Sequence, residues 1–186
     1  MALRPVNIGL SNEQREGVSK LLNENLANTY LLQIKTKKYH WDVTGPQFRS
    51  VHQLLEEQYQ ALSLNIDAIA ERTRSLGFFP LGTAREFVEV ASLQEHPGDI
   101  PVATEMISRL QNDHEHVIRT LRQHIDQCSE EFHDEGTADF LTGLMEAHEE
   151  MAWMLRSFID GESIYPNNAK PSEEGKVPVG STTNAN

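Results

Sequence analysis

One segment of the sequence combines histidine and acidic residues at a spacing that could hold a metal ion. It contains His52, Glu56, Asp67 and Glu71, and its apolar residues recur every three or four positions, as in a helix. At about 100° per residue, the four side chains lie within roughly 100° of one another around the helix axis. Imidazole and carboxylate ligands together suit first-row metals such as iron, manganese and zinc. The spacing therefore predicts a metal site on one helix face.

His52 and Asp67 are too far apart to bind one ion within a single chain. They are separated by about 22 Å along a helix that rises about 1.5 Å per residue. If all four residues serve one centre, an antiparallel helix from a second subunit must bring its own Asp67 and Glu71 to His52 of the first. A two-fold symmetric dimer would then carry two identical sites. Any one of these residues alone is equally compatible with a solvent-facing position, so the prediction depends on their common face.

His40 can supply a second nitrogen ligand. It ends the preceding helical segment, just before the short turn at residues 42–45 that leads into the helix of His52. We therefore expect the two histidines to approach each other.

A rival arrangement places two metals inside one helical bundle. It would use two further pairs of histidine and glutamate: His114, Glu115, His148 and Glu149. Bundle di-iron proteins carry Glu-x-x-His pairs, and that spacing is absent around these histidines. Both histidines also fall on apolar helix faces. We expect them to be core residues that are hydrogen-bonded to a neighbour.

Four long segments with helical periodicity must position these side chains. The first begins at Ser11, with Gln14 in the capping-box position, and runs to about Lys38. The second follows Gly45-Pro46 and ends near Gly77. The third follows Pro101 and the fourth follows Gly136, with a turn at about residues 130–137 between them. Apolar positions expected to face inward include Val18, Leu21, Leu22, Leu26 and Ile34 in the first segment and Val51, Leu55, Tyr59, Leu62, Ile66 and Ile69 in the second.

The segment between the second and third helices is long and contains prolines and glycines, which break helices. Residues 83–93 within it can form a short helix. The pattern predicts an all-α fold, a four-helix bundle with a short helix in the crossover between helices two and three. We expect the bundle to occupy residues 11–161, with flexible tails at residues 1–10 and 162–186, where helical periodicity is lacking.

Length and composition agree with one soluble domain. The chain has 186 residues, of which 38% are hydrophobic and 24% charged, so it can bury one core. No stretch is apolar enough for a membrane span and no secretory signal is recognisable, so we expect a cytoplasmic protein. The single cysteine, Cys128, agrees with a reducing compartment. A formal net charge of −12 favours cations as partners.

Several short motifs resemble a known family. They are the run His40-Trp41-Asp42-Val43-Thr44-Gly45, then Phe48 and His52, then Asp67-Ala68-Ile69-Ala70-Glu71-Arg72, and later Leu81-Gly82-Thr83. Together they resemble the signature of the Dps family, the DNA-protection-during-starvation ferritins, over residues 11–161. The resemblance implies a ferritin-like four-helix bundle that assembles into a hollow homo-dodecamer in the bacterial cytoplasm. It also implies a ferroxidase, an oxidoreductase that oxidises Fe(II), preferably with hydrogen peroxide rather than O2, and stores Fe(III) mineral. Such a protein serves iron homeostasis and protects DNA under oxidative stress.

The resemblance also implies roles for individual residues. The ferroxidase ligands correspond to His40, His52 and Glu56 of one subunit and to Asp67 and Glu71 of its two-fold mate, and zinc is a second candidate metal at the same site. Family members commonly have aspartate at the position of Glu56 and asparagine at the position of Asp42. Glu56 therefore keeps the charge of the usual ligand but reaches farther.

Further residues take roles from the same resemblance. Trp41 lies beside the site in the family and supplies or quenches oxidising equivalents, or else is an anchor at the dimer interface. Glu57 corresponds to a cavity-facing position that nucleates mineral, although it also suits a solvated surface acid. The acidic segment 130–139 resembles the lining of the three-fold iron entry pores, with Asp134, Glu135 and Asp139 as the candidate pore residues. Carboxylate rings concentrate cations at a narrow mouth, and a solvated loop is the alternative.

DNA coating, as a nucleoid DNA-binding protein with little iron chemistry, is an alternative function. Members that bind DNA use basic termini, whereas residues 1–10 contain only Arg4 and residues 162–186 contain Lys170 and Lys176 against three glutamates. Because the subunit is strongly acidic, we expect DNA binding to be weak or absent. A helical structural protein without metal chemistry is excluded only by the ligand face and the signature.

Overall fold

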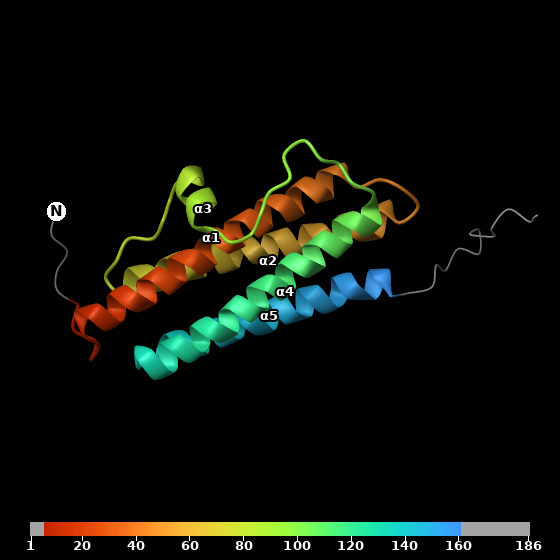
Figure 1. Ribbon diagram of the computed structural model, residues 1–186. Coiled ribbons are helices and arrows are strands. Elements are labelled where there is room, and N and C mark those ends of the chain that lie inside the picture. Colours follow the sequence, from red (N-terminus) through yellow and green to blue (C-terminus); the bar gives the residue numbers. More distant parts are fainter. Residues whose placement is uncertain (1–5, 161–186) are drawn as a thin grey trace, which may run out of the picture.

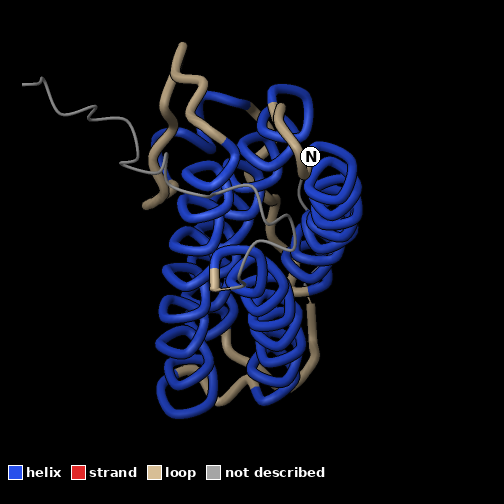
Figure 2. The backbone as a smooth tube through the Cα atoms, turned by 90° about the vertical axis from the view of Figure 1, so that its right-hand side faces the viewer, coloured by secondary structure: helices blue, strands red, loops and turns tan. Residues whose placement is uncertain are grey.

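The computed structural model describes residues 6–160, and its regular structure is entirely helical over that range. The helices are α1 (Asn12–Asp42), α2 (Phe48–Ser75), α3 (Ala84–Val90), α4 (Ala103–Asp126) and α5 (Glu135–Ile159), and the π-helical turn η1 (Gln127–Glu131) prolongs α4. The four long helices lie side by side as a bundle, and α3 lies outside it against α1 (Figures 1 and 2). The predicted all-α bundle with a short crossover helix is confirmed. Residues 1–5 and the predicted tail at 162–186 lie outside the described residues.

The bundle consists of two helical hairpins that enclose one core. α1 packs mainly against α2, and α4 packs mainly against α5. Most of the apolar positions expected to face inward are buried, among them Val18, Leu22, Leu55, Leu62 and Ile69. Ile34 is an exception, since its side chain is 46% exposed. Among the helices of residues 6–160, none is long and apolar enough to cross a membrane.

The helix ends follow local hydrogen bonding more closely than hydrophobic periodicity. The predicted capping box is present: Ser11 and Gln14 each accept a backbone N–H from the other at the start of α1. α1 continues to Asp42 rather than ending at Lys38, because an ion pair between these two residues stabilises the last turn. That turn is polar, so the spacing of apolar residues does not reveal it. α2 begins at Phe48 rather than Pro46, because the Phe48 N–H bonds to Gly45 in a preceding turn.

Two further boundaries have a similar physical cause. At the end of α2, Gly77 has φ +93°, and the N–H groups of Gly77 and Phe78 bond to Arg74 and Thr73 in a Schellman arrangement. At the start of α5, Asp134 is the N-cap and its side chain accepts the Thr137 N–H, so the helix begins at Glu135. The joint with α4 is shorter than the predicted turn at 130–137, because η1 carries the preceding helix through residue 131.

The first half of the crossover is fastened to α1 by side chains of α1. Asn28 accepts the backbone N–H groups of Ser92 and Leu93, and Tyr30 stacks on Phe87 of α3 with ring centroids 4.1 Å apart. These contacts bury one face of α3, which is a single short helix and would be marginal alone.

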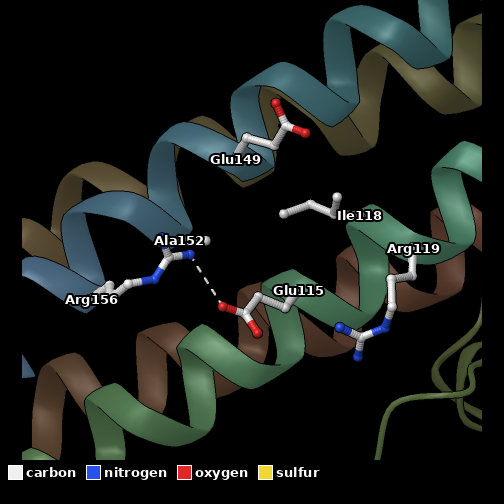
Figure 3. A pocket seen from close by; sticks show the side chains of 6 residues that line it. All are labelled: Glu115, Ile118, Arg119, Glu149, Ala152 and Arg156. Carbon is white, nitrogen blue, oxygen red and sulfur yellow. Dashed lines mark hydrogen bonds and ion pairs between the residues drawn. The ribbon is translucent and has the colours of Figure 1, made fainter.

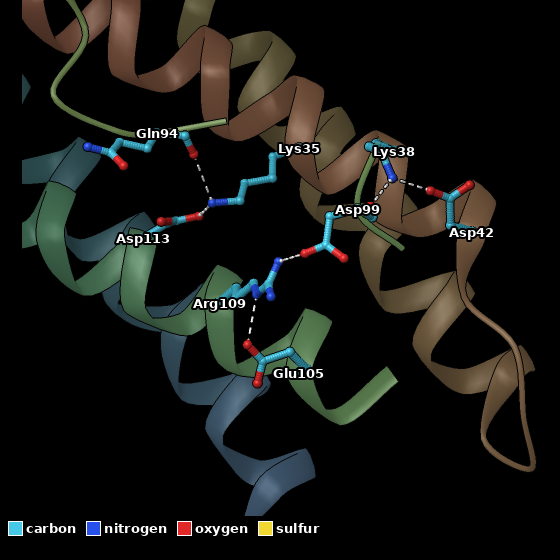
Figure 4. Close-up of polar contacts among 8 residues, drawn as sticks. All are labelled: Lys35, Lys38, Asp42, Gln94, Asp99, Glu105, Arg109 and Asp113. Carbon is cyan, nitrogen blue, oxygen red and sulfur yellow. Dashed lines mark hydrogen bonds and ion pairs between the residues drawn. The ribbon is translucent and has the colours of Figure 1, made fainter. Parts of the chain in front are cut away.

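The second half of the crossover lies between α1 and α4. Lys35 is nearly buried, donates to the Gln94 carbonyl and pairs with Asp113 of α4 at 2.6 Å, and burial raises the pKa of that carboxyl. Asp99 bonds to Arg109 of α4, as Figure 4 shows. The crossover therefore holds the two hairpins together along one edge of the bundle.

Candidate metal centre

His40 and His52 lie against each other at the α1–α2 turn. Their imidazole rings are stacked with centroids 3.7 Å apart and planes inclined by 17°. His40 belongs to the last turn of α1 and is buried, whereas His52 belongs to the second turn of α2 and is partly exposed. The short connection at residues 43–47 brings the two helix ends together, as their positions in the sequence predicted.

The two histidines hold each other in one tautomer. Nδ1 of His40 is 2.8 Å from the His52 carbonyl oxygen, and Nδ1 of His52 is 2.7 Å from the His40 carbonyl oxygen. A carbonyl oxygen can only accept, so each Nδ1 must carry a proton and donate it. In a neutral ring, the other nitrogen then keeps its lone pair. Both Nε2 atoms could therefore bind a metal ion, with backbone carbonyls fixing the orientation of the rings.

Other aromatic side chains enclose the pair. Phe48 packs beside the His52 ring at a centroid distance of 4.9 Å, and Tyr59 meets His40 edge-on at 5.2 Å. Glu56 lies one helical turn after His52 and is partly exposed. Its Oε1 atom accepts a hydrogen bond from the Tyr59 hydroxyl at 3.3 Å. Sequence reasoning assigned Tyr59 only to the core, although its position seven residues after His52 placed it on the ligand face.

Asp67 and Glu71 do not join the two histidines within the subunit. Both are exposed on α2, further along the helix. Among residues 6–160 of one chain, no group of three or more histidine, cysteine or acidic side chains is arranged to hold a metal ion. One subunit therefore presents two nitrogen ligands and a nearby carboxylate in one place and two exposed carboxylates in another.

Trp41 and Glu57 both reach solvent near the histidine pair. The Trp41 side chain is 67% exposed, and the ammonium group of Lys37 lies 5.8 Å from its ring centroid and 5.2 Å from that of Tyr59. Glu57 is exposed and accepts a hydrogen bond from Gln53. Lys37 was not singled out by sequence reasoning, although it lies one helical turn before His40 and Trp41.

The three candidate pore acids have different surroundings. Asp134 is only 5% exposed, accepts the Thr137 N–H and hydroxyl, and pairs with Arg72 of α2 at 3.0 Å. Glu135 is exposed and accepts a hydrogen bond from Ser129, and Asp139 is exposed on the first turns of α5. The Asp134 carboxylate is therefore engaged within the subunit, whereas the other two face solvent.

The rival group of two histidines and two glutamates does not converge on one point. His114 and His148 are fully buried, and their Nδ1 atoms are 2.9 Å apart, which confirms the predicted hydrogen-bonded core pair. Burial lowers the pKa of His148 to about 4 and, with the charge of His148, lowers the pKa of His114 well below its usual value.

Glu115 and Glu149 instead border a surface groove of about 360 Å³ between α4 and α5 (Figure 3). Glu115 bonds to Arg156 and Glu149 bonds to Arg122. Each carboxylate is therefore neutralised by an arginine on the opposite helix, and neither is directed at the buried histidines.

Cys128 offers no reactive thiol. The side chain is fully buried, and burial raises the pKa of the thiol to about 12. Because the thiolate is the form that binds metals and attacks electrophiles, this cysteine has a packing role.

Comparison with known proteins places this arrangement in a family. The family model for a ferritin-like domain matches residues 19–163. A low-temperature-induced protein of Nostoc sp. (strain PCC 7120), itself uncharacterised, is 62% identical over 175 residues, which cover 94% of this chain and 98% of that protein.

Two Dps proteins extend the comparison to function and structure. The DNA protection during starvation protein of Brevibacillus brevis is 37% identical over 143 residues, covering 77% of this chain and 95% of that protein. The crystal structure of a Dps protein from Vibrio cholerae O1, described as a member of the ferritin-like diiron-carboxylate superfamily, superposes with a TM-score of 0.77 at 28% identity. The match covers 86% of this chain and 99% of that one. On these grounds the chain belongs to the Dps family of ferritin-like proteins.

Proposed function

We propose that this protein oxidises Fe(II) at sites shared between two subunits and stores the ferric product in a hollow shell. Membership of the Dps branch of the ferritin-like family supports an iron-storage role. The observation that carries the proposal is the reciprocally bonded pair His40 and His52. It leaves two Nε2 lone pairs one helical turn from Glu56, while residues 6–160 of one chain hold no group of three or more ligands arranged around a metal ion.

A second copy supplies the missing ligands in this proposal. His40, His52 and Glu56 of one subunit and the partner's Asp67 and Glu71 would hold the substrate, Fe(II). Two nitrogens and three carboxylates form a mixed set that suits iron and also zinc. The helix length supports sharing, because Asp67 lies about 22 Å along α2 from His52.

Apolar residues near the exposed acids support a subunit contact there. Leu64 is 74% exposed and lies within about 60° of Asp67 and Glu71 around the axis of α2. Ile34 and Trp41 are 46% and 67% exposed, and they lie within about 20° of each other around α1. Exposed apolar patches rimmed by polar residues mark interaction surfaces, and Leu64 lies beside two exposed acids on α2.

The proposed reaction is balanced by one peroxide molecule for two ferrous ions. Each Fe(II) loses one electron, the O–O bond of hydrogen peroxide breaks, and two protons complete two water molecules. Pairing two one-electron donors with a two-electron oxidant avoids release of hydroxyl radical. O2 is the alternative oxidant. Trp41, next to His40 in the sequence, is the candidate to supply or quench oxidising equivalents.

Iron movement in the shell follows the distribution of acids. In a homo-dodecamer, Glu135 and Asp139 are the candidates to line the entry pores, while Asp134 holds the turn that presents them. Glu57 is the candidate to nucleate ferric mineral. Twelve subunits of −12 each carry a formal charge of −144, which attracts Fe(II) and repels DNA. Protection of DNA would then come from removal of iron and peroxide in the cytoplasm.

The decisive experiment compares Fe(II) oxidation in the parent protein, His52→Ala and Asp67→Ala, with peroxide and with O2. We expect both variants to lose most of the initial rate. An equimolar co-assembly of the two variants should then regain activity. In a mixed shell, a site is intact only if its histidine comes from an Asp67→Ala chain and its acid comes from a His52→Ala chain. Random pairing of equal amounts meets both conditions in about a quarter of the sites.

Two outcomes would contradict the proposal. Failure to regain activity, despite mass spectrometry showing mixed shells, would exclude shared ligands. Parental rates in both single variants would exclude this site as the ferroxidase centre. Glu89→Ala, which removes an exposed acid on α3, is the matched control for a general loss of negative charge.

A further inference from the structure

We infer that Tyr59 is a positioning residue for Glu56, holding one carboxylate oxygen so that the other is presented to the metal beside His52. The inference rests on the proposed metal site. It concerns a residue outside the ligand set and explains how a glutamate serves at this position.

The contacts of Tyr59 connect Glu56 with His40. The Tyr59 hydroxyl lies 3.3 Å from Oε1 of Glu56, and the Tyr59 ring forms a T-shaped contact with the His40 imidazole at a centroid distance of 5.2 Å. The ammonium group of Lys37 lies over the same ring at 5.2 Å. Tyr59 is thus fixed by packing on both sides, whereas Glu56 is partly exposed and contacts Tyr59 through a single oxygen.

The direction of the hydrogen bond follows from chemistry. An ionised carboxylate can only accept, so the phenol donates its proton to Oε1. Gln60 approaches the same oxygen at 3.5 Å, so both donors act on Oε1. A glutamate side chain has several rotatable bonds, and ordering it before the metal arrives reduces the entropy lost on binding.

The length of residue 56 decides whether this contact exists. Tyr59 follows Glu56 by three residues on α2, so both side chains leave the same helix face. Aspartate is one methylene shorter and carries its oxygens closer to the backbone, so we expect Glu56→Asp to lose this contact. The tyrosine and the glutamate therefore form a matched pair, and substitution of either should remove the same effect.

The test measures Co(II) binding to the assembled full-length protein, by calorimetry and by the intensity of the cobalt d–d absorption. The variants are Tyr59→Phe, Glu56→Asp and the double variant, with Tyr30→Phe as the control for loss of a hydroxyl away from the site. We expect Tyr59→Phe to weaken Co(II) binding about tenfold and to change the absorption spectrum, as the loss of an outer hydrogen bond to a ligand does. In the Glu56→Asp background, the same substitution should change the affinity less than twofold.

The outcomes separate this inference from the proposed function. An unchanged Co(II) affinity in Tyr59→Phe, or an equal loss in both backgrounds, would overturn the positioning role even if Fe(II) oxidation is normal. Non-additive binding effects in a protein that oxidises no Fe(II) would support the positioning role and overturn the proposed ferroxidase. A parent protein that binds no Co(II) at all would overturn both.

Discussion

Asp134 and Asp139 lie near the start of α5, but their different surroundings give them different roles. Asp134 is buried, caps the helix and pairs with Arg72, whereas Asp139 is exposed. The acidic composition of this segment predicted a cation-attracting surface without distinguishing the two. The hydrogen bonds and ion pair of Asp134 make it a determinant of stability, whereas Asp139 faces solvent.

Substitution of Asp134 should therefore destabilise the subunit. We expect Asp134→Ala to lower the free energy of unfolding by about 2–3 kcal/mol, because it removes the α5 cap and leaves the partly buried Arg72 without its carboxylate partner. Asp134→Asn should cost less, since the amide oxygen can still cap. Asp139→Ala, the matched control, should change stability by less than about 0.5 kcal/mol. Denaturant unfolding of metal-free protein measures all three, and equal effects of the two alanine substitutions would contradict the assignment.

At the scale of elements, the buried histidine pair joins α4 to α5 in the middle of the bundle. His114 and His148 are neutral there, because burial disfavours their charged forms. The unfolded chain binds protons at these residues below about pH 6.5, while the folded chain resists protonation until lower pH. Stability from this pair is thus fully present above pH 6.5 and is lost as the pH falls.

The pair makes acid sensitivity a testable property of the α4–α5 hairpin. With a folded pKa of about 4 for His148, that residue alone should cost about 3 kcal/mol between pH 7 and pH 4. We expect the double variant His114→Leu with His148→Leu to lose less stability than the parent over this range. His133→Leu, which removes an exposed histidine at the α4–α5 turn, should follow the parent. Guanidinium unfolding midpoints at several pH values measure this, and parallel pH profiles would refute it.

At the scale of the whole molecule, one exposed face of α2 carries Asp67, Glu71 and the large apolar side chain of Leu64. Asp67 and Glu71 lie close to Leu64 around α2, and Leu64 is the most exposed large hydrophobic residue of this helix. Such a surface is typical of one that a partner covers, and among residues 6–160 no group of three or more potential ligands is arranged to hold a metal ion. Assembly and chemistry should therefore fail together.

Leu64→Glu tests this link. Placing a like charge on both copies of a two-fold contact should prevent pairing and abolish Fe(II) oxidation, while helical content stays unchanged. Light scattering gives the mass of the assembly and circular dichroism gives the helical content. Val88→Glu alters an exposed apolar residue of α3 and should leave the assembly intact. Full assembly and parental activity in Leu64→Glu would show that this face is not the shared interface.

The negative charge of the subunit leads to a prediction about DNA. We expect no shift of duplex DNA in a gel at about 150 mM salt and little at 20 mM, because counterion release requires positive residues that neutralise phosphates. Tight binding at low salt would indicate that positive side chains cluster on the assembled surface despite the net charge of −12.

The sequence by itself determined the helical bundle, and it predicts the types of ligand and a site shared with a second subunit. Those properties follow from spacing along one chain. Apolar residues at helical intervals define the long helices, and the rise per residue sets the distance between His52 and Asp67. Local capping, as at Ser11 and Gln14, was equally readable because all its atoms come from neighbouring residues.

Only the tertiary structure decided how side chains from distant segments meet. The stacking of His40 on His52, the burial of Asp134 against Arg72 and the contact of Tyr59 with His40 depend on how α1, α2 and α5 pack. One local sequence pattern is compatible with an acidic or aromatic side chain that is solvated and with one that is buried. Its partners, and therefore its protonation state and role, are set by neighbours that the chain brings together only when it folds.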